Sequence, residues 1–223
     1  MTPLPSPWRA DLTLRLRRNL VLKVLGVSTF IWVFFVGYFH TLSHPVFPVF
    51  QMPITALDRL IPFQPQALAA YLSLWLYVGI APGMMLTLRE GLVYALWAAA
   101  LCVVGLACFY FWPTAVPPSG IDLSGHVGFA MLQGVDTSGN ACPSLHIATA
   151  MFSAIWIDRV LHHVRTPVAL RVFNALWFVA IAYSTLAIKQ HVVLDVLAGA
   201  LLGIAFAALS LRRWTWVDAL PSR

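Results

Sequence analysis

Two short polar stretches interrupt an otherwise apolar chain of 223 residues. The first is CPSLH, in which Ser144 and His146 come just before a long apolar run. The second is KQHVVLD, in which His191 and Asp195 stand four positions apart. Serine, histidine and aspartate are side chains that serve nucleophilic and general acid–base catalysis. These two stretches are therefore the candidates for chemistry.

The pair His191 and Asp195 is suited to activating an imidazole. If a helix begins near Gln190, the two side chains share one helix face, one turn apart. A carboxylate beside an imidazole fixes its tautomer and stabilises the imidazolium, which leaves the other ring nitrogen to act as nucleophile or base. The alternative is a polar pair that only caps a helix end. Ionisable residues within a membrane span are costly and usually functional, which favours catalysis.

The CPSLH stretch has the composition of a helix start. Pro143 suits the first turn of a helix, and Asn140 or Cys142 lies where a cap is expected. Ser144 and the N–H groups of that turn then form an anion site. His146 projects from the same turn, where it is placed to protonate a leaving oxygen. Together the two stretches supply what phosphoryl transfer through a covalent phosphohistidine requires.

The composition places this chemistry in a membrane. Only 10% of the residues are charged and 60% are hydrophobic, whereas soluble domains carry about 25% charged residues. A helix needs about 20 apolar residues to cross the hydrocarbon core. We therefore predict an all-α integral membrane protein with six transmembrane helices, at residues 21–40, 68–87, 91–112, 143–160, 171–188 and 192–211.

We expect three regions along the chain: a basic, interfacial N-terminus over residues 1–20, a catalytic membrane domain over 21–212, and a tail over 213–223. With six spans, twelve of the 14 Lys and Arg residues fall on the side that holds both termini; only Arg59 and Lys189 fall on the other. Basic flanks stay cytoplasmic. Both termini are thus expected in the cytoplasm of a cell bounded by this plasma (inner) membrane.

The same topology puts both polar stretches on the outer, periplasmic side. The net charge of +6 then belongs to membrane topology and anionic lipid, and no nucleic-acid partner is expected. The three cysteines form neither a disulfide framework nor a zinc pattern, so we predict no metal and no other cofactor. The proline-rich outer segments 41–67 and 112–142 exceed the usual loop length of about 12–15 residues, and we expect them to shape a lipid entrance.

The two stretches also resemble a known family. PSLH is followed by the pattern S-T-x5-H-x3-D, which starts at Ser184 and whose histidine, His191, lies 45 residues after His146. This arrangement resembles the second and third motifs of the type 2 phosphatidic acid phosphatase superfamily, which are metal-independent enzymes related to vanadium haloperoxidases. The resemblance covers about residues 110 to 205 and implies a helical bundle of six spans.

The resemblance also implies a role for each site residue. His191 would be the nucleophile and Asp195 its orienting partner. His146 would be the acid for the leaving group, and Ser144 a phosphate ligand. A second match, LSGH, ends at His126, but no sustained apolar helix follows it, so we favour His146.

The chain departs from the family at its basic positions. The first family motif carries a lysine and an arginine, and the third normally reads serine-arginine. Here Thr185 stands in place of that arginine, and WPTAVPPSGIDLSG contains no basic residue. PSLH, KQH and the proline-rich segment instead resemble the branch of inositol phosphorylceramide synthases and their bacterial relatives, which transfer phospholipid headgroups.

The missing arginines favour a phosphodiester. A phosphate monoester is close to a dianion at neutral pH, and its transfer is usually stabilised by Arg, Lys or metal. A diester carries one charge, so Lys189 and a helix N-terminus would form a sufficient cradle. Two alternatives remain: Lys189 as an interfacial anchor, and Arg59 as the missing cation.

The sequence therefore predicts a lipid phosphoester transferase or hydrolase that acts on a phospholipid headgroup, with water or an alcohol, such as a second lipid, as acceptor. A phosphatase for lipid phosphate monoesters is the nearest alternative. An intramembrane serine protease built on Ser144 and His191 is another. The non-enzyme alternatives are a haem carrier with His146 and His191 as axial ligands, and a transporter or structural membrane protein.

Overall fold

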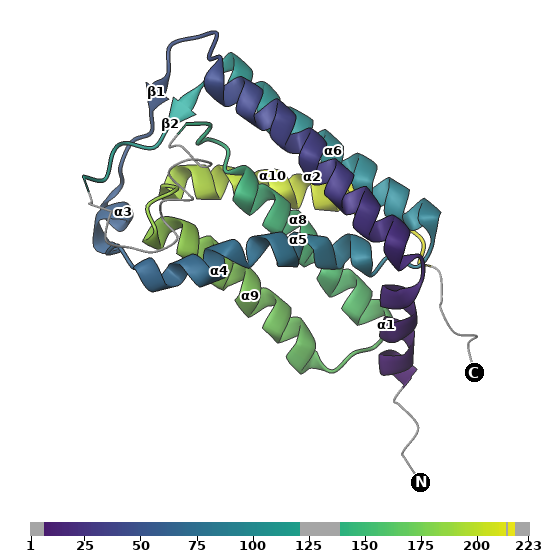
Figure 1. The fold of residues 1–223 in the computed structure, drawn as a ribbon. Coiled ribbons are helices and arrows are strands. Elements are labelled where there is room, and N and C mark those ends of the chain that lie inside the picture. The colour runs from purple at the N-terminus through teal and green to yellow at the C-terminus, as the bar shows by residue number, and fades with distance from the viewer. Residues whose placement is uncertain (1–6, 121–138, 213, 217–223) are drawn as a thin grey trace.

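The computed structural model describes residues 7–120, 139–212 and 214–216. Helices dominate the described part, and two short strands pair at one end (Figure 1). In chain order the elements are α1 (Pro7–Arg17), α2 (Leu20–Ser43), β1 (Phe50–Gln51), α3 (Ala56–Leu60), the 3-10 helix η1 (Pro65–Ala67), α4 (Leu68–Leu72), α5 (Leu74–Gly83), α6 (Leu88–Phe111), β2 (Thr114–Ala115), α8 (Leu145–His163), α9 (Val168–Ala187) and α10 (Val193–Leu211).

Four helices within the described ranges are long and apolar enough to cross a membrane: α2, α6, α9 and α10. They indicate a membrane protein, and their bounds lie within three residues of four expected spans. The other two expected spans, 68–87 and 143–160, do not meet the same test of length and apolar composition. Each differs for its own physical reason.

The stretch 68–87 is divided at Ser73 into α4 and α5. The Ser73 hydroxyl donates to the carbonyl of Ala70 at 2.6 Å, the kind of local bond that competes with regular helix. The backbone bonds from Ser73 N to Ala69 O and from Tyr77 N to Ser73 O continue across the break. The two helices therefore follow one another along one path through the bundle (Figure 1).

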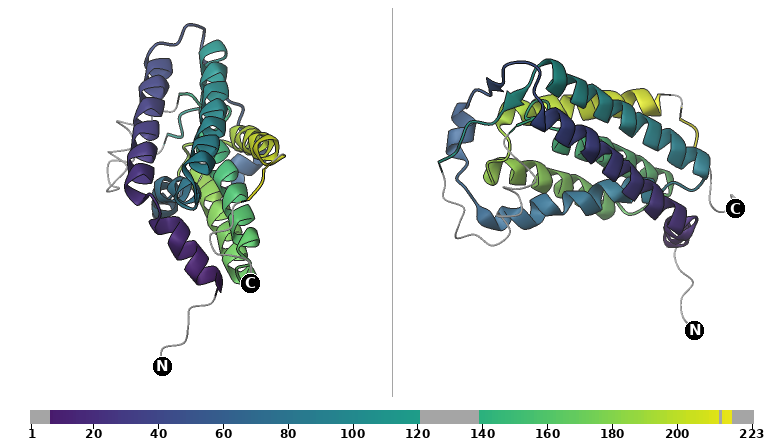
Figure 2. Two further views of the ribbon diagram at one scale, coloured as in Figure 1. Left: turned by 90° about the vertical axis from the view of Figure 1, so that its right-hand side faces the viewer. Right: turned by 45° about the horizontal axis from the view of Figure 1, so that its top comes forward.

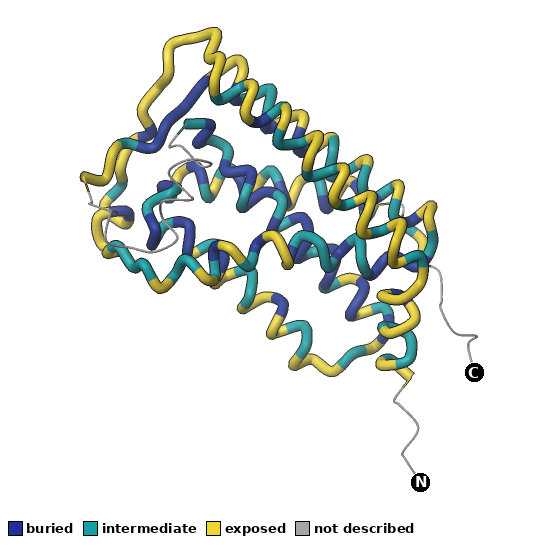
Figure 3. The backbone as a smooth tube through the Cα atoms, in the orientation of Figure 1, coloured by how far each residue is buried: buried dark blue, intermediate teal, exposed yellow. Residues whose placement is uncertain are grey.

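The fourth expected span, α8, is the central helix of the bundle. It packs against α5, α6, α9 and α10, and it is the most extensively buried of the long helices (Figure 3). The charged residues of α8, Asp158 and Arg159, lie on its less buried side. Asp158 accepts two hydrogen bonds from Arg171 of α9, at 2.7 and 3.1 Å. These charges, with the histidines of the helix, make α8 less apolar than the four helices named above.

Two glycines allow α10 to lie directly on α8, the most extensive helix contact in the fold. A Cβ added at Gly199 would lie 2.3 Å from the Ser144 carbonyl oxygen, and one at Gly203 would lie 2.5 Å from that of Ala148. The spacing is G-x-x-x-G, the small-residue pattern that lets two membrane helices approach closely. The sequence pattern thus explains the packing.

The two ends of the bundle differ. At one end, here called the site end, β1 pairs in parallel with β2, and α3 lies near the beginning of α10 (Figure 1). At the other, here called the far end, α1 leads into α2 and α10 finishes (Figures 1 and 2). Helices α2 and α6 form one flank of the molecule, with α4, α5 and α9 on the other (Figure 2). The site end is where both polar stretches lie.

Candidate functional site

Ser144 begins α8 as its N-cap. Its side-chain oxygen accepts a hydrogen bond from the N–H of Ile147 at 3.3 Å, and serine is among the preferred residues at this position. The expected caps, Asn140 and Cys142, were therefore wrong, and Pro143 precedes the helix instead of lying in its first turn. As a result the Ser144 side chain is fully buried.

His191 lies in the turn before α10 and not on the helix itself. Helix α9 ends in a Schellman motif, in which Gln190 N–H donates to Thr185 O and Lys189 N–H donates to Leu186 O. Helix α10 then begins at Val193. The expected start near Gln190 was wrong because the left-handed residue Lys189 (φ 61°) closes α9 and turns the chain first.

The structure brings Ser144, His146, His191 and Asp195 together at the site end. His191 Nδ1 lies 3.2 Å from Asp195 Oδ2. On the opposite side of the ring, Nε2 lies 3.1 Å from Ser144 Oγ and 3.2 Å from His146 Nδ1. Ser144 and Asp195 are fully buried and His191 nearly so. One ring nitrogen thus faces a carboxylate and the other faces two further polar groups.

Asp195 also fixes the frame around the imidazole. Both of its carboxylate oxygens accept the N–H of Val192, at 3.1 and 3.2 Å, which caps α10. Its backbone carbonyl accepts the N–H of Ser144 at 3.0 Å. The same residue therefore ties the start of α10 to the start of α8. The relative position of His191 and Ser144 follows from these bonds.

Tyr71 of α4 is a further member of the site that the sequence did not reveal. Its hydroxyl lies 3.0 Å from His146 Nε2, the two ring centroids are 5.2 Å apart, and the side chain is 2% exposed. A lone tyrosine in an apolar stretch gives no signal of its own. Its helix joins the site only through the tertiary fold.

Lys189 holds the segment around α3 against the site. Its ammonium donates to the backbone carbonyls of Asp58 at 3.0 Å and Ile61 at 2.5 Å, while Asp58 Oδ1 accepts the N–H of Val193 at 2.8 Å. The backbone of Lys189 is left-handed, a conformation that costs a non-glycine residue about 1–2 kcal/mol. An ammonium has three N–H donors, so these two bonds leave one donor to consider for substrate.

The positions where the family has an arginine hold no cation here. Ser184 and Thr185 are fully buried, and their hydroxyls donate to carbonyls within α9, at 2.6 and 2.9 Å. Arg59 is exposed on α3. His126 of the second motif match lies outside the described residues. Among the residues that the structure describes, the charges close to the site are therefore few.

Cys142 is another nucleophile type close to the site, two residues before the start of α8. Burial, followed by the nearby Asp195 carboxylate, raises the pKa of the Cys142 thiol to about 11. Its thiol is therefore protonated at neutral pH, and a thiolate is the nucleophilic form of cysteine. This favours the imidazole over the thiol as nucleophile.

The positions of the possible ligands bear on metal and haem binding. In residues 7–120, 139–212 and 214–216, no group of three or more His, Cys, Asp or Glu side chains is placed to hold a metal ion. The rings of His146 and His191 contact each other, with their facing nitrogens 3.2 Å apart, which leaves no space for a porphyrin between them. This argues against the haem alternative.

A large cavity adjoins the site. It has a volume of about 730 Å³ and lies between α2, α5, α6 and α8. Its wall is mainly apolar, and it reaches His146 and Tyr71 at the site end. The polar site is thus continuous with an apolar space inside the bundle.

The family model described as PAP2 superfamily matches residues 91–218, which is more than half of the chain and includes Ser144, His146, His191 and Asp195. The comparisons with curated proteins and with solved structures gave no match.

Proposed function

The chain belongs to the PAP2 superfamily, and we propose that it is a membrane lipid phosphoester transferase or hydrolase that acts through a phosphohistidine on His191. Superfamily membership indicates phosphatase or phosphoesterase activity on lipid phosphates. The observation that carries the mechanism is the position of the His191 ring. Its Nδ1 faces the Asp195 carboxylate and its Nε2 faces Ser144 and His146.

In the first step, His191 Nε2 attacks the phosphorus of the substrate. The carboxylate of Asp195 favours the tautomer with its proton on Nδ1, which leaves a lone pair on Nε2 for the attack. An N–P bond forms and the P–O bond to the leaving group breaks. His146, protonated on both ring nitrogens, gives its Nδ1 proton to the departing oxygen and becomes a neutral imidazole, and Asp195 stabilises the positive charge on the His191 ring.

In the second step, an acceptor oxygen attacks the phosphorus from the side that the leaving group has vacated. His146 removes the proton of that acceptor, the N–P bond breaks, and His191 returns to its starting state. With water as acceptor the reaction is hydrolysis, and with an alcohol it is headgroup transfer. Ser144 and the helix N-terminus of α8 hold phosphate oxygens.

The supply of positive charge favours a diester substrate and hence the transferase branch. Thr185 is buried where the family has an arginine. Lys189 donates two hydrogen bonds to backbone carbonyls. The third donor of Lys189 is the proposed cationic contact to substrate. One lysine and a helix N-terminus suit one negative charge better than two.

We also propose the membrane arrangement that follows from the charges. Six passes, with α4–α5 and α8 included, place both termini in the cytoplasm and the site at the outer leaflet of the plasma membrane. The supporting observation is that the start of α2 and the finish of α10 lie at the same end of the bundle (Figure 1). The substrate partner is then a lipid of the outer leaflet.

A serine nucleophile is the second candidate. Ser144 Oγ lies 3.1 Å from His191 Nε2, and with Asp195 the three resemble a Ser-His-Asp arrangement. However, Ser144 is fully buried and its oxygen already accepts the N–H of Ile147. We therefore place the nucleophile on His191 and give Ser144 the role of phosphate ligand.

Two turnover assays on detergent-purified protein test the proposal. One offers phosphatidic acid, and the other offers phosphatidylinositol or phosphatidylglycerol with diacylglycerol or ceramide as acceptor. Headgroup moved to the acceptor would support the transferase branch. Inorganic phosphate released from phosphatidic acid would support the phosphatase alternative. Absence of turnover with both substrates would contradict the proposed function.

Replacing Tyr71 with phenylalanine tests whether this residue positions His146. In this mechanism the Tyr71 hydroxyl oxygen accepts the Nε2–H of His146, which holds the ring with Nδ1, the atom that gives and takes the proton, towards His191. We expect the Tyr71→Phe variant to lose about tenfold in kcat, a fraction of the 10²–10⁴ that acid–base catalysis contributes. The pH profile of kcat should shift, which a purely structural role would not cause.

The matched control for that variant is Tyr183→Phe. Tyr183 is an exposed tyrosine of α9 whose hydroxyl accepts a hydrogen bond from Gln64. Its replacement therefore also removes one hydrogen-bonded hydroxyl. Its kcat and pH profile should stay those of the wild type. Equal behaviour of the two variants would remove Tyr71 from the mechanism.

A further inference from the structure

The cavity beside the site is deep. Its wall includes His146 and Tyr71 at the site end, and Asn19 and Lys23 at the far end. Along α2 the lining extends from Lys23 to Tyr38, a stretch that rises about 22 Å. One leaflet contributes only about half of the roughly 30 Å hydrocarbon core. The cavity thus continues past the depth that one leaflet provides.

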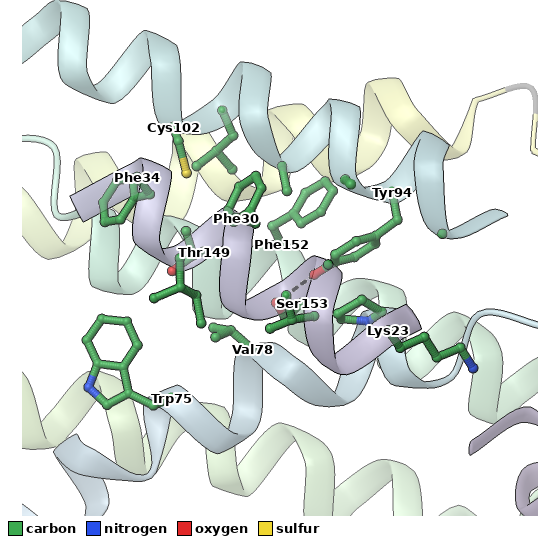
Figure 4. Close-up of a pocket in the computed structure, with 18 of the residues that line it drawn as sticks. Lys23, Phe30, Phe34, Trp75, Val78, Tyr94, Cys102, Thr149, Phe152 and Ser153 are labelled. Carbon is green, nitrogen blue, oxygen red and sulfur yellow. Dashed lines mark hydrogen bonds between the residues drawn. The ribbon is translucent and has the colours of Figure 1, made fainter. Parts of the chain in front are cut away.

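The wall of the cavity suits a hydrocarbon. Rings and aliphatic side chains dominate it (Figure 4), among them Phe30, Phe34, Val78 and Phe152. Its few hydroxyls already have partners. Tyr94 and Ser153 bond to each other at 3.0 Å, and Thr149 donates to Leu145 O at 2.8 Å. A hydrocarbon can therefore occupy the space without leaving a polar group unsatisfied.

The far end of the cavity holds no lysine charge inside it. The Lys23 ammonium donates to the carbonyls of Arg15 and Gly83, and Figure 4 shows it directed away from Phe30 and Phe34. Its aliphatic stem contributes to the wall, as the stems of long cationic side chains commonly do. The chain end of a lipid would therefore meet methylene groups there.

We infer that this cavity holds a hydrocarbon chain of the lipid substrate, with its methyl end towards Lys23 and its phosphate at His146 and His191. The inference rests on the proposed function and extends it, because it places the tail inside the helix bundle and not among the lipids outside. A chain long enough to reach the far end contacts the wall there, and a shorter chain does not. The enzyme should therefore prefer a substrate whose chain fills it.

Two glycines set the space near the far end. Gly26 of α2 and Gly91 of α6 both line the cavity, and a Cβ added at either would have no atom within 4 Å. A leucine at either position would extend into the cavity from a backbone that accepts it. The chain also offers a control, because Gly79 of α5 has the same open surroundings and is absent from the lining residues.

The first experiment compares two substrates with one headgroup, carrying dipalmitoyl or dioctanoyl chains, in mixed micelles. The leucine of Gly91→Leu should take up the space of about two methylene groups of the substrate chain. The kcat/KM for the long-chain substrate should therefore fall about tenfold, and the kcat/KM for the short-chain substrate should stay unchanged. Gly26→Leu should do the same from the opposite wall, and Gly79→Leu should change neither. A loss that is equal for both chain lengths, or no loss, would overturn the inference.

The second experiment does not depend on turnover. Phosphatidic acid with a photoactivatable diazirine near the methyl end of one chain is added to the His191→Ala variant, and labelled peptides are identified by mass spectrometry. We expect labels on α2 and α6 near Lys23, and their loss when Gly91→Leu is added. Labels confined to the exposed faces of α9 and α10 would overturn the inference. Labels near Lys23, together with a wild-type protein that turns over no lipid, would support the chain site while contradicting the proposed reaction.

Discussion

The His191→Ala variant is expected to lose turnover by roughly 10⁴-fold or more, the range seen when a nucleophile or its partner base is removed. The reason is geometric. His191 Nε2 is the atom that faces Ser144 and His146, while Nδ1 is engaged by the Asp195 carboxylate. Release of phosphate or transfer of the headgroup, measured per mole of purified protein, gives the result.

The control for this variant is His162→Ala. His162 is an exposed histidine in the last turn of α8, at the opposite end of that helix from Ser144. Its loss should leave turnover within about twofold of wild type, as for a surface residue. Ser144→Ala completes the comparison: it should keep measurable activity if Ser144 only holds phosphate. Activity that survives in His191→Ala and vanishes in Ser144→Ala would contradict the assigned roles.

The Gly199→Ala variant should be the most damaging change that removes no chemical group. The added Cβ would lie 2.3 Å from the Ser144 carbonyl oxygen and 3.3 Å from Ala148 N. Backbone atoms cannot rotate away, so α10 must move off α8. Overpacking of this kind costs about 1–3 kcal/mol of unfolding free energy. A shift of about 1 Å in catalytic geometry costs about 100-fold in rate, because Asp195 and Ser144 are joined across this contact.

Thermal unfolding in detergent and turnover, measured on the same preparation, test that expectation. Gly79→Ala serves as the control, because its new Cβ meets no atom within 4 Å. We expect both the melting temperature and the activity of Gly199→Ala to fall, and those of Gly79→Ala to stay near wild type. Unchanged stability and activity in Gly199→Ala would mean that the close approach of α8 and α10 is not required.

The sequence was informative wherever one physical effect dominated. Apolar length located α2, α6, α9 and α10 to within three residues of the expected spans, because lipid demands apolar side chains all around. It also placed CPSLH and KQH at the same end of the molecule. The G-x-x-x-G spacing of Gly199 and Gly203 was present but unused, and it would have predicted the packing of α10 against a neighbour.

The remaining features depend on competition between local and tertiary effects. Ser144, and not an earlier residue, caps α8 because its oxygen reaches the N–H of Ile147. His191 falls outside α10 because Lys189 adopts a left-handed conformation in the preceding turn. Tyr71 reaches His146 from a separate helix. No spacing along the chain encodes such a contact, so it emerges only from the packed structure.

The central claim is that the transferred phosphoryl group is carried by His191, and its capture is the most direct test. Protein mixed with substrate that carries labelled phosphorus is quenched within one turnover, digested and analysed by mass spectrometry under alkaline conditions. We predict a label on the peptide that contains His191, stable to alkali, lost in acid, and absent from His191→Ala. An acid-stable label on the peptide of Ser144 would contradict the account and move the nucleophile to the serine.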